Sequence, residues 1–407
     1  MAGIAALAAA YVLSQFYRSF LAVLTPALSL ELGATKADLS AASGAWFAVF
    51  ALMQFAIGIW LDRHGPRRTA AALLALGGGG GAFLFALAVQ PWMVIAAMAL
   101  IGMGCAPVLM ASVFIFAKSY SPARLAVLTS FLMGIGMLGN VVSTSPLAAA
   151  AEAFGWRPVI AALGLLTLLV AAAILAFVRD PAVEEGAHAS AGFRGYLELI
   201  RLPVLWPILP LAALNYAAAA GIRGLWAGPY LDEVYGADAL VIGQVTLFMA
   251  LAMAVGTFIY GPLDTLFGTR KWVAVAGNTL GMAAIAWLAA FPLAGISAAT
   301  VALVIIGLAG GSFGIIMAHG RAFMPAHLTG RGVTLLNFFS IGGVGLMQFA
   351  TGAVVTAGTV PGEPAAGYRT LFFFYAGLLA ASLLVYLFSR DARPERSVRR
   401  RARAAES

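Results

Sequence analysis

Long runs of apolar residues dominate the chain, and short polar stretches separate them. An α-helix needs about 20 apolar residues to cross the hydrocarbon core of a bilayer. Twelve runs reach that length, and they predict an all-α membrane protein with twelve transmembrane helices. The predicted segments are residues 5–28, 41–61, 69–89, 92–117, 125–150, 157–178, 206–230, 240–263, 272–291, 297–319, 332–357 and 368–389.

The composition agrees with this pattern. Hydrophobic residues make up 62% of the 407 residues and charged residues only 10%, whereas soluble domains contain about 25% charged residues. The single cysteine, Cys105, excludes an internal disulfide and any site built from several cysteines. The N-terminus lacks a basic start and stays apolar for longer than a signal peptide does, so we expect it to remain as the first membrane helix.

Basic residues in the polar stretches predict the orientation of the chain. With a cytoplasmic N-terminus, 19 of the 24 Lys and Arg residues fall in the inner loops and the C-terminal tail, and three in the outer loops. Cytoplasmic loops are enriched in basic residues, so both termini are expected in the cytoplasm. The remaining two, Arg18 and Arg223, lie inside hydrophobic segments.

The two parts of the chain repeat at an offset of 203 residues: Pro26 matches Pro229, and the loop Gly58–Arg68 matches Gly261–Lys271. Such repeats form two pseudo-symmetric six-helix halves, with the substrate site between them near the middle of the membrane. The longest polar stretch separates the halves. We therefore predict an N-terminal half at 1–178, a linker at 179–203, a C-terminal half at 204–389 and a basic tail at 390–407.

The two arginines inside hydrophobic segments are the main candidates for substrate binding. A charge near the middle of a membrane helix costs roughly 3 kcal/mol on insertion scales, and such residues usually face a cavity. No acidic residue lies in the interior of any hydrophobic segment. Arginine binds carboxylate and phosphate through paired, charge-assisted hydrogen bonds, so Arg18 and Arg223 predict an anionic substrate. Alternatively, each arginine only binds backbone carbonyl groups of neighbouring helices.

Other polar side chains share a helix face with these arginines. Steps of three and four residues place Tyr11, Ser14, Arg18 and Thr25 on one side of the first segment. The seventh segment has Asn215, Arg223, Trp226 and Tyr230 on roughly one side. The substrate site is predicted to comprise the two arginines together with Tyr11, Ser14, Tyr17, Trp226 and Asn337.

The loop after the second segment resembles the G-x-x-x-D-R-x-G-R-R signature of the major facilitator superfamily. The residues that match are Gly58, Asp62, Arg63, Gly65, Arg67 and Arg68. The resemblance implies that these residues gate the transporter, because in that superfamily they form a charge relay with a neighbouring helix end. Alternatively, the three arginines are ordinary anchors of cytoplasmic loops. The second copy differs, since Asp264 lies one residue early and Thr265 stands at the position equivalent to Asp62.

The first and seventh segments also resemble the organophosphate/phosphate antiporter and organic-anion porter branch, through Tyr17-Arg18 before Pro26 and Arg223 before Pro229. In that branch one arginine from each half clamps the anion. Arg223 is only six residues before its proline, whereas Arg18 is eight before Pro26. Two residues turn a helix by about 200°, so Arg223 faces the cavity only if the glycines around it distort the helix.

These observations predict a secondary transporter in a bacterial inner membrane that moves a small organic anion by alternating access, and not an enzyme. We predict no cofactor, no metal site and no nucleic-acid partner; the partners are the anionic solute and membrane lipid, and the expected state is a monomer. His319, at the inner end of the tenth segment, is expected to be interfacial. The alternatives are an efflux carrier for neutral or cationic compounds and a transporter-like ligand sensor that does not transport.

Overall fold

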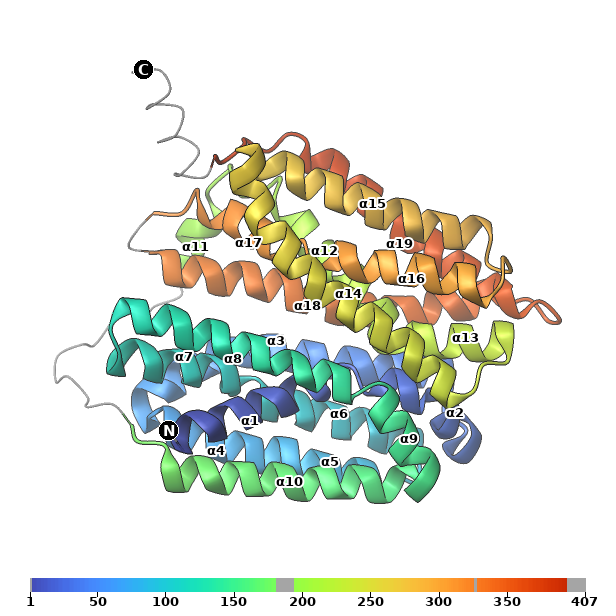
Figure 1. Ribbon diagram of the computed structural model, residues 1–407, viewed down its shortest axis with the longest axis horizontal. Coiled ribbons are helices and arrows are strands. Elements are labelled where there is room, and N and C mark those ends of the chain that lie inside the picture. Colours follow the sequence, from blue (N-terminus) through green and yellow to red (C-terminus); the bar gives the residue numbers. More distant parts are fainter. Residues whose placement is uncertain (1, 181–193, 326–327, 394–407) are drawn as a thin grey trace. The chain divides into compact units, whose positions relative to one another are not determined.

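The computed structural model describes residues 2–180, 194–325 and 328–393, and these residues are almost entirely helical (Figure 1). The first half of the sequence forms α1 (Ala2–Phe16), α2 (Leu21–Leu32), α3 (Lys36–His64), α4 (Pro66–Leu73), the π-helix η1 (Leu74–Gly79), α5 (Gly80–Ala86), α6 (Pro91–Cys105), α7 (Pro107–Ser119), α8 (Pro122–Val142), α9 (Ser145–Phe154) and α10 (Trp156–Phe177). The second half forms α11 (Arg194–Ile200), α12 (Leu209–Gly221), the π-helix η2 (Ile222–Trp226), α13 (Ala227–Tyr235), α14 (Ala239–Phe267), α15 (Lys271–Ala290), α16 (Ile296–Gly310), α17 (Phe313–Arg321), α18 (Thr329–Gly358) and α19 (Pro364–Tyr386).

Nine helical stretches in the described residues are long and apolar enough to cross a membrane, and two bent helix pairs raise the number to as many as eleven. The bounds agree with eleven of the predicted segments to within a few residues. The predicted seventh segment is helical over α12, η2 and α13, but it is not among the eleven. The structure thus supports a multi-pass helical protein, and the twelfth span stays a prediction.

The first predicted segment is a broken helix rather than a continuous one. α1 and α2 meet at an angle of 52°, and residues 17–20 between them form a turn. The Ser19 hydroxyl contacts the Gln15 carbonyl oxygen at 3.5 Å, and serine back-bonding of this kind bends helices. The fifth predicted segment is also broken, between α8 and α9, with a bend of 42°.

The chain forms two compact units, each of which combines residues from distant parts of the sequence. The first unit comprises Met1–Ala187, Gly224–Leu247 and Gly345–Thr356; the second comprises His188–Arg223, Phe248–Val344 and Ala357–Ser407. Within the first unit, α10 lies beside α1, α4 and α5; within the second, α15 lies beside α16 and α19 (Figure 1). The predicted linker falls largely on residues 181–193 and the tail on 394–407, which lie outside the described residues.

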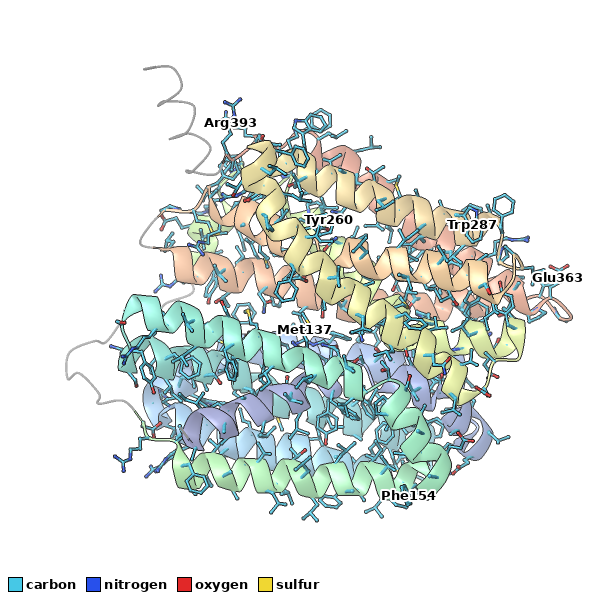
Figure 2. All side chains as sticks on the ribbon, in the orientation of Figure 1. Met137, Phe154, Tyr260, Trp287, Glu363 and Arg393 are labelled. Atoms are coloured by element: carbon cyan, nitrogen blue, oxygen red, sulfur yellow. The ribbon has the colours of Figure 1, made fainter. Side chains whose placement is uncertain are left out.

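Apolar side chains point outward from both units, as a lipid-facing surface requires. Phe154 of α9 is 74% exposed and Trp287 of α15 is 37% exposed, and both project away from the helices that bear them (Figure 2). A water-soluble protein rarely exposes large contiguous apolar patches. These outward side chains therefore agree with the hydropathy of the sequence.

Candidate functional site

Arg18 lies in the turn between α1 and α2, where its half-buried side chain reaches two aromatic rings of α3. Its guanidinium carbon is 5.4 Å from the ring centroid of Trp46 and 5.4 Å from that of Phe50. The two rings stack at 5.0 Å with an interplanar angle of 16°. Cation–π contacts of this kind stabilise a guanidinium by about 0.5–2 kcal/mol, so the aromatic pair holds the positive charge in place. Trp46 and Phe50 were not among the predicted site residues.

A cluster of polar side chains joins the two broken helices of the first unit next to this arginine. The hydroxyl groups of Ser19 and Ser143 lie 2.8 Å apart, and Ser19 also contacts the Asn140 side-chain oxygen at 3.4 Å. Ser19 lies in the break between α1 and α2, and Ser143 follows the end of α8. Both spans are therefore interrupted at points that hydrogen-bond to each other. Discontinuous membrane helices commonly form the binding sites of transporters.

The other predicted binding residues of the first segment are buried. Gln15 donates a hydrogen bond to the Tyr11 hydroxyl at 2.8 Å, and the Tyr17 and Thr167 hydroxyl groups lie 3.0 Å apart. Tyr11 is 6%, Ser14 2% and Tyr17 0% exposed. The expectation of one continuous polar face from Tyr11 to Thr25 is wrong, because the helix breaks at residues 17–20 and changes direction by 52°.

The predicted residues of the second half occupy different environments. Arg223 lies in η2 and is only 3% exposed within the second unit. The helix is therefore distorted at this point, as the surrounding glycines suggested. Trp226 belongs to the first unit, where its indole nitrogen donates to the Thr351 hydroxyl at 2.9 Å. Asn337 is half-buried on α18 in the second unit.

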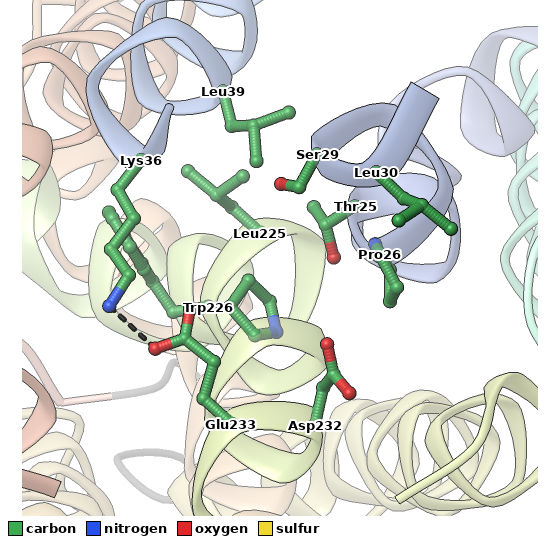
Figure 3. Close-up of a pocket in the computed structure, with 11 residues that line it drawn as sticks. Thr25, Pro26, Ser29, Leu30, Lys36, Leu39, Leu225, Trp226, Asp232 and Glu233 are labelled. Carbon is green, nitrogen blue, oxygen red and sulfur yellow. Dashed lines mark hydrogen bonds and ion pairs between the residues drawn. The ribbon is translucent and has the colours of Figure 1, made fainter. Parts of the chain in front are cut away.

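A ligand-sized pocket of about 380 Å³ lies in the first unit between α2, the start of α3 and the helix that follows η2 (Figure 3). Of the predicted binding residues, only Trp226 lines it. Lys36 donates to Glu233 at 2.6 Å across the pocket. Burial and the neighbouring Glu233 raise the pKa of Asp232, which follows the seventh predicted segment. The residues lining this pocket are Thr25, Pro26, Ser29, Leu30, Lys36, Leu39, Leu225, Trp226, Pro229, Asp232 and Glu233.

The loop with the signature contacts the carboxylate of Asp180, which was not among the predicted site residues. The backbone amide of Arg67 donates to Asp180 at 2.8 Å, and the Arg67 side-chain nitrogen Nε lies 3.8 Å from the same carboxylate. Gly65 has φ of +79°, and a Cβ there would lie 2.9 Å from the carboxyl carbon of Asp180. Asp180 therefore binds the N-terminus of α4, and the close approach requires glycine at position 65.

The remaining signature residues take no comparable part in this contact. Arg63 and Arg68 are exposed. A Cβ added at Gly58 would meet nothing within 4 Å among the described residues. The side chain of Asp62 lies outside the described residues. The proposed gating role of Asp62 thus stays a prediction.

The second copy of the loop is held in a similar way. The Arg270 side chain contacts Asp264 at 3.1 Å. The backbone amides of Arg270 and Lys271 donate to Asp391 at 3.2 and 3.0 Å. Burial opposes ionisation of Asp391, but these bonds and one from Thr269 outweigh it and lower its pKa. Asp391 thus binds the N-terminus of α15 as Asp180 binds that of α4.

The dipeptides Arg179-Asp180 and Arg390-Asp391, one after each half, are the sequence signal that could have revealed these contacts. The segment that follows α19 makes further bonds. The Lys271 ammonium group donates to the carbonyl oxygens of Leu387 and Ser389 at 2.6 and 2.9 Å. His319, which we expected at the membrane interface, is 0% exposed, with ring nitrogens 2.6 Å from the Tyr386 hydroxyl and 2.8 Å from the Arg390 carbonyl oxygen. Its position in the membrane stays a prediction.

Comparison with known proteins decides the family. The model of the Major Facilitator Superfamily matches residues 7–339, most of the chain. The chain belongs to the Major Facilitator Superfamily. It is therefore a multi-pass membrane transporter rather than an enzyme, and membership implies secondary transport by alternating access. No protein of curated function matches the sequence.

Solved structures of other major facilitators share the fold. A bacterial homologue of the human lysosomal transporter Spinster is 20% identical, with a TM-score of 0.76 over 95% of this chain and 96% of that chain. The nucleoside transporter NupG is 14% identical, with a TM-score of 0.76 over 95% and 98%. The xylose transporter XylE from E. coli is 11% identical, with a TM-score of 0.71 over 96% of each chain. These low identities show the common fold alone.

Proposed function

We propose that this major facilitator transports a small organic anion, a carboxylate or a phosphate ester, across a bacterial inner membrane. The observation that carries the proposal is the position of Arg18. Its guanidinium lies half-buried at the break of the first span, against Trp46 and Phe50. The arginine is thus placed at the kind of helix interruption at which transporters bind their substrates.

The chemistry of this position favours an anion. A guanidinium presents several donors in a planar fork that matches a carboxylate or phosphate group. The attraction is stronger in a poorly hydrated setting than in water. Trp46 is 0% and Phe50 6% exposed, so the rings behind Arg18 exclude water from one side of its guanidinium. An anion that approaches from the other side meets a guanidinium group whose orientation the two rings already fix.

The remaining predicted residues take supporting roles in this proposal. Arg223 is the corresponding cation of the second half, and Tyr11, Ser14, Tyr17, Trp226 and Asn337 shape the substrate path. Gly58, Asp62, Arg63, Gly65, Arg67 and Arg68 form the cytoplasmic gate. The protein acts as a monomer with both termini in the cytoplasm.

One observation favours the alternative of a cationic substrate. The 380 Å³ pocket contains two carboxylates, Asp232 and Glu233, against one ammonium group, that of Lys36. The Lys36–Glu233 ion pair balances one of these carboxylates. The carboxylate of Asp232 thus has no balancing cation among the residues that line the pocket. An efflux carrier for cations would bind a positively charged substrate beside it.

Ligand-dependent thermal stability separates the two functions. Purified protein in detergent is heated with phosphates, sugar phosphates, mono- and dicarboxylates, neutral sugars and cationic dyes, because bound ligand raises the melting temperature by mass action. Wild type is compared with Arg18→Ala, Arg18→Lys and the surface variant Arg369→Ala as a matched control. Counterflow in liposomes then tests whether the stabilising compound is transported.

The anion proposal predicts stabilisation by one anion class, which Arg18→Ala abolishes and Arg369→Ala preserves. Arg18→Lys keeps part of the affinity, because the charge remains but the fork is lost. Stabilisation by a cationic or neutral compound that persists in Arg18→Ala would refute the proposal and support efflux. Binding without counterflow would instead identify a sensor.

A further inference from the structure

A buried hydrogen-bond donor without a partner lies beside Arg18. The side chain of Trp46 on α3 is fully buried, and its indole nitrogen Nε1 has no hydrogen-bond partner among the described residues. Two other indole nitrogens of the first unit are bonded. Nε1 of Trp156 donates to Glu31 at 3.0 Å, and Nε1 of Trp226 donates to a hydroxyl group at 2.9 Å. A buried donor left unpaired is destabilising, so the indole of Trp46 needs an explanation.

The packing around Trp46 holds this donor in place. The indole stacks on Phe50 with 5.0 Å between ring centroids, and it meets Phe47 edge to face at 4.8 Å. The backbone is fixed as well, because a Cβ at Gly102 of α6 would collide with the Trp46 carbonyl oxygen. The indole is therefore not free to turn toward a different acceptor.

The charged group next to this indole cannot accept its hydrogen. The guanidinium carbon of Arg18 lies 5.4 Å from the ring centroid of Trp46, and a guanidinium has five N–H donors and no acceptor. The two side chains thus present donors, and no acceptor, to the same neighbourhood. The acceptor that suits both is a negatively charged oxygen, because hydrogen bonds to an ionised partner are roughly twice as strong as neutral ones.

We propose that Trp46 is a substrate-binding residue, whose indole N–H donates to the same oxyanion that Arg18 binds. The inference rests on the proposed function and adds a second donor to it. The N–H groups of a guanidinium and of an indole point outward from the edges of their planes, so an oxyanion accepts from both where the two edges meet. Nε1 is enclosed by protein, so the anion reaches it through a movement of the long, half-buried Arg18 side chain.

This arrangement makes Trp46 a residue that determines specificity. Arg18 supplies the charge, and the indole adds a directed hydrogen bond without a further charge. Each oxygen of a carboxylate or phosphate group has lone pairs for more than one donor, so such a group satisfies both side chains at once. A neutral amide of the same shape would turn N–H donors of its own toward them and should bind poorly.

The test replaces the indole N–H and keeps the shape of the ring. The amino acid 3-benzothienylalanine, which has sulfur in place of the N–H group, is introduced at position 46, and Trp46→Phe is made as a second variant. The same replacement at position 156 is the matched control, since the indole of Trp156 donates to Glu31. Binding of inorganic phosphate, acetate and succinate to purified protein in detergent is measured by calorimetry, together with the melting temperature without ligand.

The two positions should give opposite results. At position 46 the replacement should raise the Kd of the bound anion about tenfold, which corresponds to 1.4 kcal/mol, and should leave the melting temperature without ligand unchanged or higher. At position 156 it should lower that melting temperature, because a hydrogen bond is lost, and should leave the Kd unchanged.

An unchanged Kd in both variants of position 46, with binding lost in Arg18→Ala, would overturn this inference and leave the anion proposal standing. Binding of equal strength in Arg18→Ala, or no binding of any of the three anions by wild type, would contradict the anion proposal and this inference with it. A lower melting temperature without ligand for 3-benzothienylalanine at position 46 would show that the N–H is already bonded in the free protein, which also overturns the inference. If Trp46→Phe fails to fold, the replacement of equal shape decides.

Discussion

The carboxylate of Asp391 is expected to stabilise the second unit in a pH-dependent way. It accepts hydrogen bonds from the backbone amides of Arg270 and Lys271 at the start of α15, with N–O distances of 3.2 and 3.0 Å. Its pKa is lowered in the folded protein. A lowered pKa means that the stabilisation is present above the unfolded value of about 4 and is lost as the pH falls through the folded value.

The magnitude follows from the two kinds of interaction that are lost. Removal of a helix-capping side chain costs about 0.5–2 kcal/mol, and a charge at an exposed helix terminus contributes about 0.3–1 kcal/mol. Because Asp391 is exposed, we expect Asp391→Ala to lower the free energy of unfolding by about 1–2 kcal/mol. Asp391→Asn keeps the hydrogen-bond acceptor and loses only the charge, so we expect it to lower the free energy of unfolding by about 0.3–1 kcal/mol. At about 2–4 °C per kcal/mol for 150–250 residues, the alanine variant should melt roughly 2–8 °C lower.

The assay is thermal unfolding of the purified protein in detergent at several pH values between neutrality and the acid limit of solubility. Wild type should lose stability relative to Asp391→Asn as the pH falls below about 4, and the two curves should converge there. Asp238→Asn is the matched control, because Asp238 accepts a single amide, that of Val241, at 2.8 Å at the start of α14. An unchanged melting temperature in Asp391→Ala, or a constant difference between wild type and Asp391→Asn at every pH, would refute the reasoning.

Two further predictions concern the contacts that α13 makes with α2 and with the start of α3. A Cβ at Gly228 would collide with a backbone carbonyl oxygen of α2, so Gly228→Val should destabilise the protein by about 1–3 kcal/mol and lower the melting temperature; wild-type stability would contradict this close packing. The Lys36–Glu233 ion pair has side chains 23% and 36% exposed. A double-mutant cycle with Lys36→Ala and Glu233→Ala should therefore give a coupling energy below about 1 kcal/mol, and a much larger value would show that the pair is poorly hydrated.

Hydropathy predicted the helical spans well because lipid requires long apolar helices wherever the chain crosses it. Eleven predicted segments have counterparts in the structure, and the signature loop identified the family. The exception is the seventh segment, which combines Asn215 and Arg223 with a π-helical distortion. The residues that make this segment functionally interesting also weaken its resemblance to an ordinary membrane helix.

The details of the site were harder to predict, because they depend on contacts between residues far apart in the sequence. No glycine or proline marks the break at residues 17–20. A continuous helix was therefore assumed for the first segment, and this assumption wrongly placed Arg18 and Thr25 on one face. Trp46 and Phe50 had no sequence feature that linked them to Arg18. The carboxylates Asp180 and Asp391 could have been recognised from their repeated Arg-Asp setting.

The segment that follows α19 affects how this protein should be truncated or tagged. Secondary structure suggests Tyr386 as a natural end point, since α19 ends there. The next residues, however, hold other helices: Leu387 and Ser389 bind the side chain of Lys271, Arg390 binds His319 and Asp391 binds the start of α15. An expression clone that stops at Tyr386 would lose all of these bonds, whereas a fusion placed after Arg393 would keep them.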